Sequence, residues 1–335
     1  MTQRPEFFAA MRESDTLSEV LRTVRLTGAI FLRAEFRKPW GFQAPAAGDA
    51  AALLAPGTER IVPFHLVTEG RATVRVEGCE PVHLDAGEIV VLPRGDAHIL
   101  GNGAAAQLID SSTLLPAILE GSMLFEHGGG GGPVTRFICG YVGCDRQGER
   151  SFLAGLPPLF KVAVPEDGSA AWIESAIRHL VAESEATRPG SRALLGKLAE
   201  ALFIETLRRY MAQLRRADIG WLAAARDPAV GRALASIHRE PTRTWTVAEL
   251  AKRAGASRTE FARRFVAVLG QTPLAYLASW RISLGATRLR SSDESVLEVA
   301  LAVGYESEAA FNRAFKREVG LPPARYRRQQ RARAA

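Results

Sequence analysis

The sequence predicts an α+β protein of several domains: a β-barrel over residues 1–165, a helical linker over residues 166–226, and an all-α domain with two helix-turn-helix motifs over residues 227–330. Three observations predict this arrangement. Short apolar runs separated by glycines fill the first region, apolar residues at helical spacing follow, and a motif recurs at an offset of 50 residues near the C-terminus. The chain of 335 residues is long enough for each domain to bury its own core.

The strands of the first domain are predicted from short apolar or alternating runs, such as residues 64–67, 72–77 and 88–92. Glycines that favour turns stand between and after these runs, at Gly70, Gly78, Gly87 and Gly95. Regularly spaced short strands with glycine turns are typical of a barrel or a sandwich.

Two helices are predicted in the linker, over residues 172–180 and 194–214, with a break at the Arg-Pro-Gly sequence of residues 188–190. Their apolar residues form a stripe that packs either on the first domain or on a second copy of the chain. The pattern is the same in both cases. We expect a homodimer, joined through the barrel or through these helices.

Composition and hydropathy favour a folded protein of the cytoplasm. Hydrophobic residues make up 47% of the chain and charged residues 24%, near the average for soluble proteins. No apolar run approaches the roughly 18 residues of a membrane-spanning helix, so no membrane partner is expected. Cys79, Cys139 and Cys144 are an odd number in a chain without a signal-peptide pattern, which favours reduced thiols.

The positive charge is concentrated at the C-terminal end. Residues 227–335 hold 19 Lys and Arg against 10 Asp and Glu, whereas the preceding residues hold 24 against 26. A localised basic segment suits a polyanionic partner, because neutralising phosphates releases condensed counterions. Charge alone fits DNA, RNA or an anionic membrane.

The basic segment contains an internal repeat. Ser257, Phe261, Arg263, Phe265, Gly270, Pro273 and Tyr276 recur as Ser307, Phe311, Arg313, Phe315, Gly320, Pro323 and Tyr326. Gly255 recurs as Gly304 at an offset of 49, which indicates one residue inserted in the turn between helices. The repeat therefore predicts one supersecondary unit built twice.

Each copy carries the signals of two helices joined by a tight turn. Capping boxes are predicted at the pairs Thr246 and Glu249, Ser257 and Glu260, and Ser295 and Glu298. Gly255 and Gly304 stand where the first helix of each copy must end and the chain must reverse, which favours a residue that tolerates positive φ. The result is a helix, a tight turn and a helix, twice.

The second helix of each copy is predicted to bury its phenylalanines and to present a short-chained, basic face. The candidate DNA-contacting residues are Arg258, Thr259, Ala262 and Arg263 in the first copy and Ala309, Asn312, Arg313 and Lys316 in the second. Arginine pairs with guanine and asparagine with adenine in the major groove, and small residues allow close approach. The alternative, that these are solvated surface charges, does not explain the repeat, the caps and the charge together.

Between the copies, residues 273–290 are predicted to form one continuous helix with Pro273 in its first turn. Such a helix spans roughly 27 Å, close to one turn of the DNA duplex. Both basic helices are therefore expected to enter successive major grooves on one face of double-stranded DNA.

The segment from about Asp227 to Arg328 resembles the AraC/XylS family of bacterial regulators. The residues that carry the resemblance are Trp245-Thr-Val-Ala-Glu-Leu-Ala, Ser257-Arg-Thr-Glu-Phe-Ala-Arg-Arg-Phe, Gly270-Gln-Thr-Pro and Gly304-Tyr-Glu-Ser-Glu-Ala-Ala-Phe-Asn-Arg-Ala-Phe-Lys-Arg. The resemblance implies base contacts by Thr259, Ala262 and Arg263 and by Asn312 and Arg313. It also implies a promoter or operator as the DNA partner, RNA polymerase as a further partner, and a role as an activator or a repressor of transcription. Ala262 replaces the longer polar side chains common in relatives, which predicts thinner readout by the first helix.

The first domain resembles a cupin barrel. Gly87, Pro93, Gly95, His98 and Asn102 match the second cupin signature, and His65 with Glu69 matches the end of the first. Pro63 stands where the first signature places a partner histidine, so His65, Glu69 and His98 offer three ligands to a divalent metal in place of four. The order of Leu17-Ser-Glu-Val-Leu, Pro39-Trp40-Gly41, the His65 segment, Cys139-Gly140 and Leu156-Pro157-Pro158 is similar to that of regulators with a cupin-like effector domain.

Three functions of the first domain follow. A sensor binds a small-molecule effector through His65, Glu69 and His98 and requires no cofactor. An enzyme uses a metal held by the same residues to activate oxygen or to polarise a carbonyl. A barrel with satisfied histidines serves dimerisation alone. We favour the sensor over catalysis, because one cupin ligand is missing and a DNA-binding segment is attached.

Overall fold

The computed structural model describes residues 15–23, 26–54, 60–103, 108–114, 124–127, 131–144, 155–163, 188–215 and 218–334, with a few isolated positions between these ranges. The chain forms two compact units. One consists of residues 25–149 and 156–213 and is called the β unit. The other consists of residues 1–24, 150–155 and 214–335 and is called the helical unit.

Two sheets make up the β unit. Its strands are β1 (Thr27–Arg37), β2 (Trp40–Ala44), β3 (Arg60–Glu69), β4 (Arg71–Val76), β5 (Val82–Asp85), β6 (Glu88–Val91), β7 (His98–Asn102), β8 (Ile109–Asp110), β9 (Leu124–His127), β10 (Val134–Cys144) and β11 (Phe160–Ala163). One sheet has the order β11-β6-β3-β10-β1-β9 and the other β5-β4-β7-β2-β8. The β unit also contains the helix α3 (Ala47–Leu54) and the 3-10 turn η1 (Ser111–Leu114).

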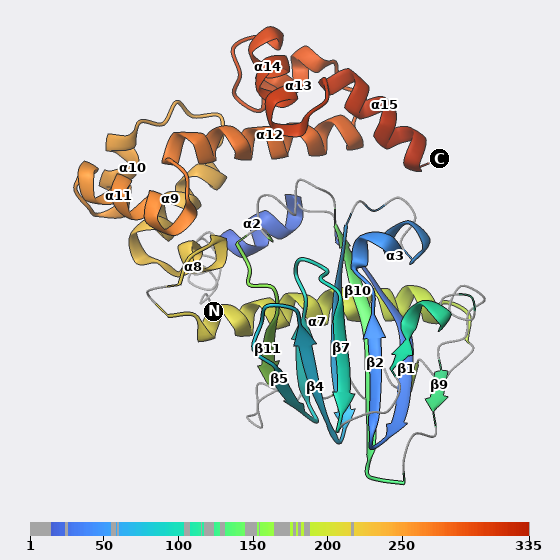
Figure 1. Ribbon diagram of the computed structural model, residues 1–335. Coiled ribbons are helices and arrows are strands. Elements are labelled where there is room, and N and C mark those ends of the chain that lie inside the picture. Colours follow the sequence, from blue (N-terminus) through green and yellow to red (C-terminus); the bar gives the residue numbers. More distant parts are fainter. Residues whose placement is uncertain are drawn as a thin grey trace, which may run out of the picture. The chain divides into compact units, whose positions relative to one another are not determined.

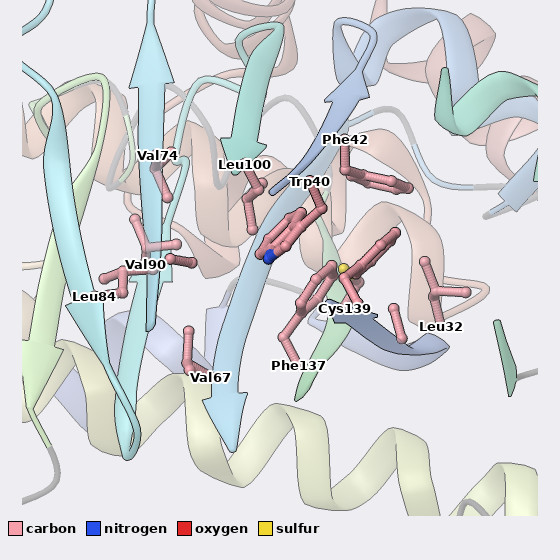
Figure 2. Packing of buried hydrophobic residues seen from close by; sticks show 13 residues of the cluster. Leu32, Trp40, Phe42, Val67, Val74, Leu84, Val90, Leu100, Phe137 and Cys139 are labelled. Carbon is pink, nitrogen blue, oxygen red and sulfur yellow. The ribbon is translucent and has the colours of Figure 1, made fainter. Parts of the chain in front are cut away.

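The core of the β unit lies between the two sheets. Strands of both sheets contribute buried side chains to one hydrophobic cluster, including Leu32 of β1, Phe42 of β2 and Phe137 of β10. Figure 2 shows Trp40 and Phe137 close together, and their ring centroids are 5.5 Å apart. Burying aromatic side chains of this size supplies much of the free energy that holds the two sheets together.

The helix α7 (Ser191–Gln213) packs on β1, β10 and β11 of the same unit (Figure 1). Paired glycines permit the approach of helix and strand: a Cβ on Gly196 would lie 2.7 Å from the carbonyl oxygen of Gly28. The Gly28 backbone N–H donates to Glu200 Oε1 at 3.1 Å. Packing on its own domain is thus one use of the linker's apolar stripe. Most of the predicted helix over residues 172–180 lies outside the described residues.

The helical unit holds the predicted repeat. Its helices are α2 (Thr16–Thr23), α8 (Trp221–Arg226), α9 (Pro228–Arg239), α10 (Val247–Ala254), α11 (Arg258–Leu269), α12 (Pro273–Ser291), α13 (Val296–Ala302), α14 (Glu308–Val319) and α15 (Pro323–Ala334). In Figure 1 the long helix α12 connects α9–α11 at one end with α13–α15 at the other. The prediction of one α+β chain with a β-rich domain and two helix-turn-helix motifs is confirmed.

Helix ends follow the predicted signals, with one difference. Complete capping boxes form at Thr246 with Glu249 and at Ser295 with Glu298. At Ser257 the hydroxyl accepts from the Glu260 backbone N–H, but the Glu260 carboxylate binds Arg263 instead of returning to the cap. Gly255 and Gly304 have φ of 70° and 87°, as the reversal of the chain requires.

Each half of the helical unit has its own core. Phe311 and Phe315 are fully buried in the second half, within one cluster that includes Leu289 and Tyr326. In the first half, Phe261 and Phe265 occupy the equivalent positions and are also fully buried. Among the described residues, no helix combines the length and apolar character needed to cross a membrane.

Candidate DNA-binding surface and effector cavity

The outward face of α11 is fixed by the burial of its opposite face. Phe261, Phe265 and Val268 are buried, and the helical period turns the residues between them outward. Arg258, Thr259 and Arg263 are exposed, and Ala262 is half-buried. A DNA duplex can therefore reach the side chains of the four residues that are predicted to contact it, including the small Ala262.

Glu260 holds the guanidinium of Arg263 on this face. Arg263 donates from Nη2 to Glu260 Oε1 at 2.8 Å and from Nε to Oε2 at 3.1 Å. The two side chains are 70% and 54% exposed, so solvent screens the pair and its net contribution to stability is small. The arginine of the first copy is thus oriented, and part of its charge is compensated.

The equivalent face of α14 differs in this respect. Ala309, Arg313 and Lys316 are exposed, and Asn312 is half-buried with its amide 3.4 Å from Glu308 Oε1. Ala310 occupies the position that corresponds to Glu260. Within the described part of the chain, the structure gives Arg313 no hydrogen-bonding or ionic partner. The second helix therefore presents an uncompensated arginine beside an amide.

The spacer between the two faces is a single helix, as predicted. The nineteen residues of α12 span about 28 Å at the rise of an α-helix. Successive major grooves on one face of B-DNA are separated by about 34 Å. Gly285 allows α12 to lie against Phe311 of α14, because a Cβ there would lie 2.8 Å from the Phe311 ring.

The β unit contains a cavity of about 60 Å³. Most side chains on its wall are aliphatic or aromatic, such as Leu32, Phe42 and Ile61, and His65 and His98 also line it. Figure 2 shows Leu32 and Phe42 in the neighbouring packing of the two sheets. A cavity of this kind suits a small ligand with a large apolar part.

His65 and His98 form a buried pair beside this cavity. Their Nε2 atoms are 2.7 Å apart, and the residues are 2% and 4% exposed. His65 Nδ1 lies 2.7 Å from Cys139 Sγ, and His98 Nδ1 lies 2.9 Å from the Asp96 carbonyl oxygen. Burial lowers the pKa of both imidazoles, and the neighbouring His98 lowers that of His65 further. Burial raises the pKa of the Cys139 thiol, so all three groups are uncharged near pH 7.

Glu69, the third candidate ligand, is not brought to this pair. The register between β3 and β10 shifts between Arg136 and Phe137, and Thr68 is the extra residue on β3. Beyond the shift, the exposed Glu69 forms an ion pair with Arg136. Among the described residues there is no group of three or more His, Cys, Asp or Glu side chains placed to hold a metal ion.

Sequence reasoning missed three features of these regions. The ion pair of Glu260 with Arg263 was not predicted, because the spacing of Ser257 and Glu260 fits a capping box in the sequence although the carboxylate does not close one in the structure. The contact of Cys139 with His65 joins β10 to β3, and no local spacing shows it. Nε2 of the buried His238 lies 2.8 Å from the Tyr276 hydroxyl oxygen, and the Trp280 ring stacks on the imidazole at a centroid distance of 4.0 Å. His238 lies on α9, where its pattern reads as an ordinary helix end.

Comparison with known proteins identifies both regions. The family model described as Cupin matches residues 15–212, and the model described as Helix-turn-helix domain matches residues 250–329. The chain is 35% identical over 274 residues to an AraC-like transcription regulator of Streptomyces lividans, covering 80% of this chain and 87% of that protein. It is 30% identical over 325 residues to the HTH-type transcriptional regulator AlkR of Acinetobacter baylyi, covering 94% of this chain and 99% of that protein.

One solved structure is also similar to part of this chain. The DNA-binding domain of AdpA, solved in complex with a target DNA, is 37% identical, covers 32% of this chain and 96% of that chain, and aligns with a TM-score of 0.31.

Proposed function

This chain belongs to the AraC family of DNA-binding transcription regulators, and on that premise we propose that it reads its operator through the outward faces of α11 and α14. The observation that carries this proposal is the repeat itself. Arg263 and Arg313 occupy equivalent positions on exposed faces, while the phenylalanines on the opposite faces are fully buried. Two short-chained, cationic helices joined by one rigid spacer suit adjacent major grooves of a duplex.

The test is a binding measurement on sequences that the full-length protein itself selects from a random duplex pool. Arg313→Ala is expected to weaken binding to the selected sequence by roughly 5- to 150-fold, equivalent to about 1–3 kcal/mol for a bidentate base contact. The same change should weaken binding to scrambled DNA far less. Arg192→Ala, which removes an exposed arginine from α7, is the matched control and should leave both affinities unchanged. Equal losses on selected and scrambled DNA would identify Arg313 as a phosphate contact instead.

We propose that the β unit binds a small effector in its cavity and performs no catalysis. The relatives named above are regulators of transcription, and the cavity places two uncharged imidazoles beside an apolar wall. For the effector to change DNA binding, it must bind one arrangement of the protein more tightly than another. His65 and His98 are the proposed effector-site residues, and Glu69 has no place in the described wall of this cavity.

We further propose that the active form is a homodimer that acts with RNA polymerase at its promoters. The roles expected from the sequence are effector binding by residues 1–165, a helical linker over residues 166–226 and DNA binding by residues 227–330. Sedimentation of the full-length protein with and without operator DNA tests the dimer. A single monomeric species in both conditions would contradict it.

A further inference from the structure

We propose that the cavity of the β unit binds an uncharged, predominantly hydrocarbon molecule, and that His65 and His98 form a closed hydrogen-bonded chain that neither ligates a metal nor receives an acid. This proposal rests on the proposed function, in which the cavity takes up an effector. It specifies the chemical class of that effector.

The Asp96 carbonyl oxygen at the end of this row of hydrogen bonds fixes the direction of each of them. The Asp96 carbonyl oxygen can only accept, so His98 Nδ1 donates to it. A neutral imidazole has one donor and one acceptor, so His98 Nε2 accepts from His65 Nε2–H at 2.7 Å. His65 Nδ1 must then accept, and the Cys139 thiol, 2.7 Å away, is its donor. All four ring nitrogens are used within the protein.

The neutral forms that this chain requires are those that burial favours. Both imidazoles lie among apolar side chains, where a charged ring loses its hydration. The hydrogen bonds of His65 and His98 are therefore complete without a ligand.

A divalent metal does not fit these residues. Each histidine ligand must offer an unprotonated nitrogen to the ion. His98 Nε2 already accepts from His65, and His65 Nε2 carries the proton. Binding through both Nε2 atoms would break this link and turn the His65 Nδ1–H towards the Cys139 thiol. Glu69, which pairs with Arg136, supplies no third ligand.

The remainder of the described wall offers no charge to a ligand. No Lys, Arg, Asp or Glu lines it among the described residues. The Tyr141 hydroxyl donates to the Leu54 carbonyl oxygen. The hydroxyl of Ser111 is a remaining polar group, and it is uncharged. A buried carboxylate or ammonium would lose its hydration without a counter-charge, whereas burial removes the apolar surface of a hydrocarbon from water and is favourable. The wall thus favours a hydrocarbon with at most one neutral polar group.

The binding test uses the full-length protein with toluene as the probe and benzoate as a charged probe of similar shape, both at pH 7.5. Toluene is expected to bind saturably and to raise the thermal midpoint of the β unit, whereas benzoate and zinc chloride leave it unchanged. Ala44→Leu, which extends a side chain on the cavity wall, should abolish toluene binding. Ala193→Leu, on the exposed face of α7, is the matched control and should retain it.

Histidine ring resonances provide a second readout that does not depend on a variant that folds. Nitrogen-15 correlation spectra near pH 7 should show opposite neutral tautomers, with the proton on Nε2 of His65 and on Nδ1 of His98. Imidazolium signals, equal tautomers or a shift of both rings on addition of zinc chloride would overturn the proposal.

The proposed ligand class and the proposed effector role of the β unit are tested by different outcomes. Saturable binding of benzoate or zinc in place of toluene overturns the hydrocarbon assignment and leaves the effector function intact. Toluene binding without any effect on DNA affinity supports the assignment of the cavity and contradicts the proposed effector role of the β unit.

Discussion

Protonation of His238 should destabilise the helical unit as the pH falls below neutrality. His238 is 5% exposed, and burial lowers its pKa from 6.5 to about 3. The Tyr276 hydroxyl accepts from Trp221 Nε1 at 2.8 Å, and its oxygen also lies 2.8 Å from His238 Nε2, to which the hydroxyl can donate when that nitrogen is unprotonated. Protonation would place a positive charge on a buried ring whose Nδ1 has no hydrogen-bond partner in the described structure, so burial disfavours the imidazolium that the unfolded chain readily forms.

Proton linkage gives the direction and the size of this change in the unfolding free energy. Between a folded pKa of about 3 and an unfolded pKa of 6.5, the unfolded chain binds more protons, so stability is complete above pH 6.5 and is lost as the pH falls towards 3. From pH 7 to pH 5 this single group should cost about 2 kcal/mol of unfolding free energy. Carboxyl groups of this unit with a lowered pKa, such as Glu294 at about 2, change stability mainly below the unfolded pKa of 4.5 and so outside the compared range of pH 7 to pH 5.

The assay is urea unfolding of the full-length protein at pH 7 and pH 5, followed by tryptophan fluorescence. His238→Gln is the comparison, because its side-chain oxygen can accept from the Tyr276 hydroxyl and does not titrate. The wild type should lose about 2 kcal/mol more than this variant between the two pH values. Equal losses in both proteins would refute the assignment of His238 as a buried neutral acceptor. Other histidines titrate identically in the two proteins and cancel in the difference.

Three further substitutions test contacts described above. Glu260→Gln should release Arg263 and remove a negative charge, so binding to scrambled DNA at low salt should tighten by roughly 2- to 5-fold. Unchanged or weaker binding would contradict the claim that Glu260 compensates the charge of Arg263. Gly285→Ala should lower the urea midpoint of the helical unit, because the clash with Phe311 costs about 1–3 kcal/mol and alanine gains only roughly 1 kcal/mol over glycine in a helix. A raised midpoint would disprove this close packing. Gly196→Ala should likewise loosen α7 from β1, seen as faster amide exchange along α7, and unchanged exchange would argue against tight docking.

The helical unit was predictable from the sequence because its signals are local. Caps, turn glycines and phenylalanine spacing all act within about a dozen residues, and the repeat presents them twice. The long helix α12 and the outward positions of Arg263 and Arg313 follow from these signals alone. What the sequence could not show is a choice between two local partners, since Glu260 is able to cap Ser257 or to bind Arg263.

The cavity was less predictable because it is built from distant strands. The cupin-like spacing correctly drew attention to His65 and His98, which the structure places in contact. It did not show that a register shift carries Glu69 to the exposed end of β3, nor that Cys139 arrives from β10 to occupy His65 Nδ1. Strand register is set by pairing across the sheet, so a motif read along one strand cannot fix which side chains meet.

The most direct test of the double reader is methylation interference at guanine N7, a major-groove position, on the sequence that the full-length protein selects. Two interference clusters about 10 base pairs apart are expected, one for each of α11 and α14. Arg263→Ala should erase one cluster and Arg313→Ala the other. A single cluster, or loss of the same cluster in both variants, would contradict the claim that the two repeats read adjacent major grooves.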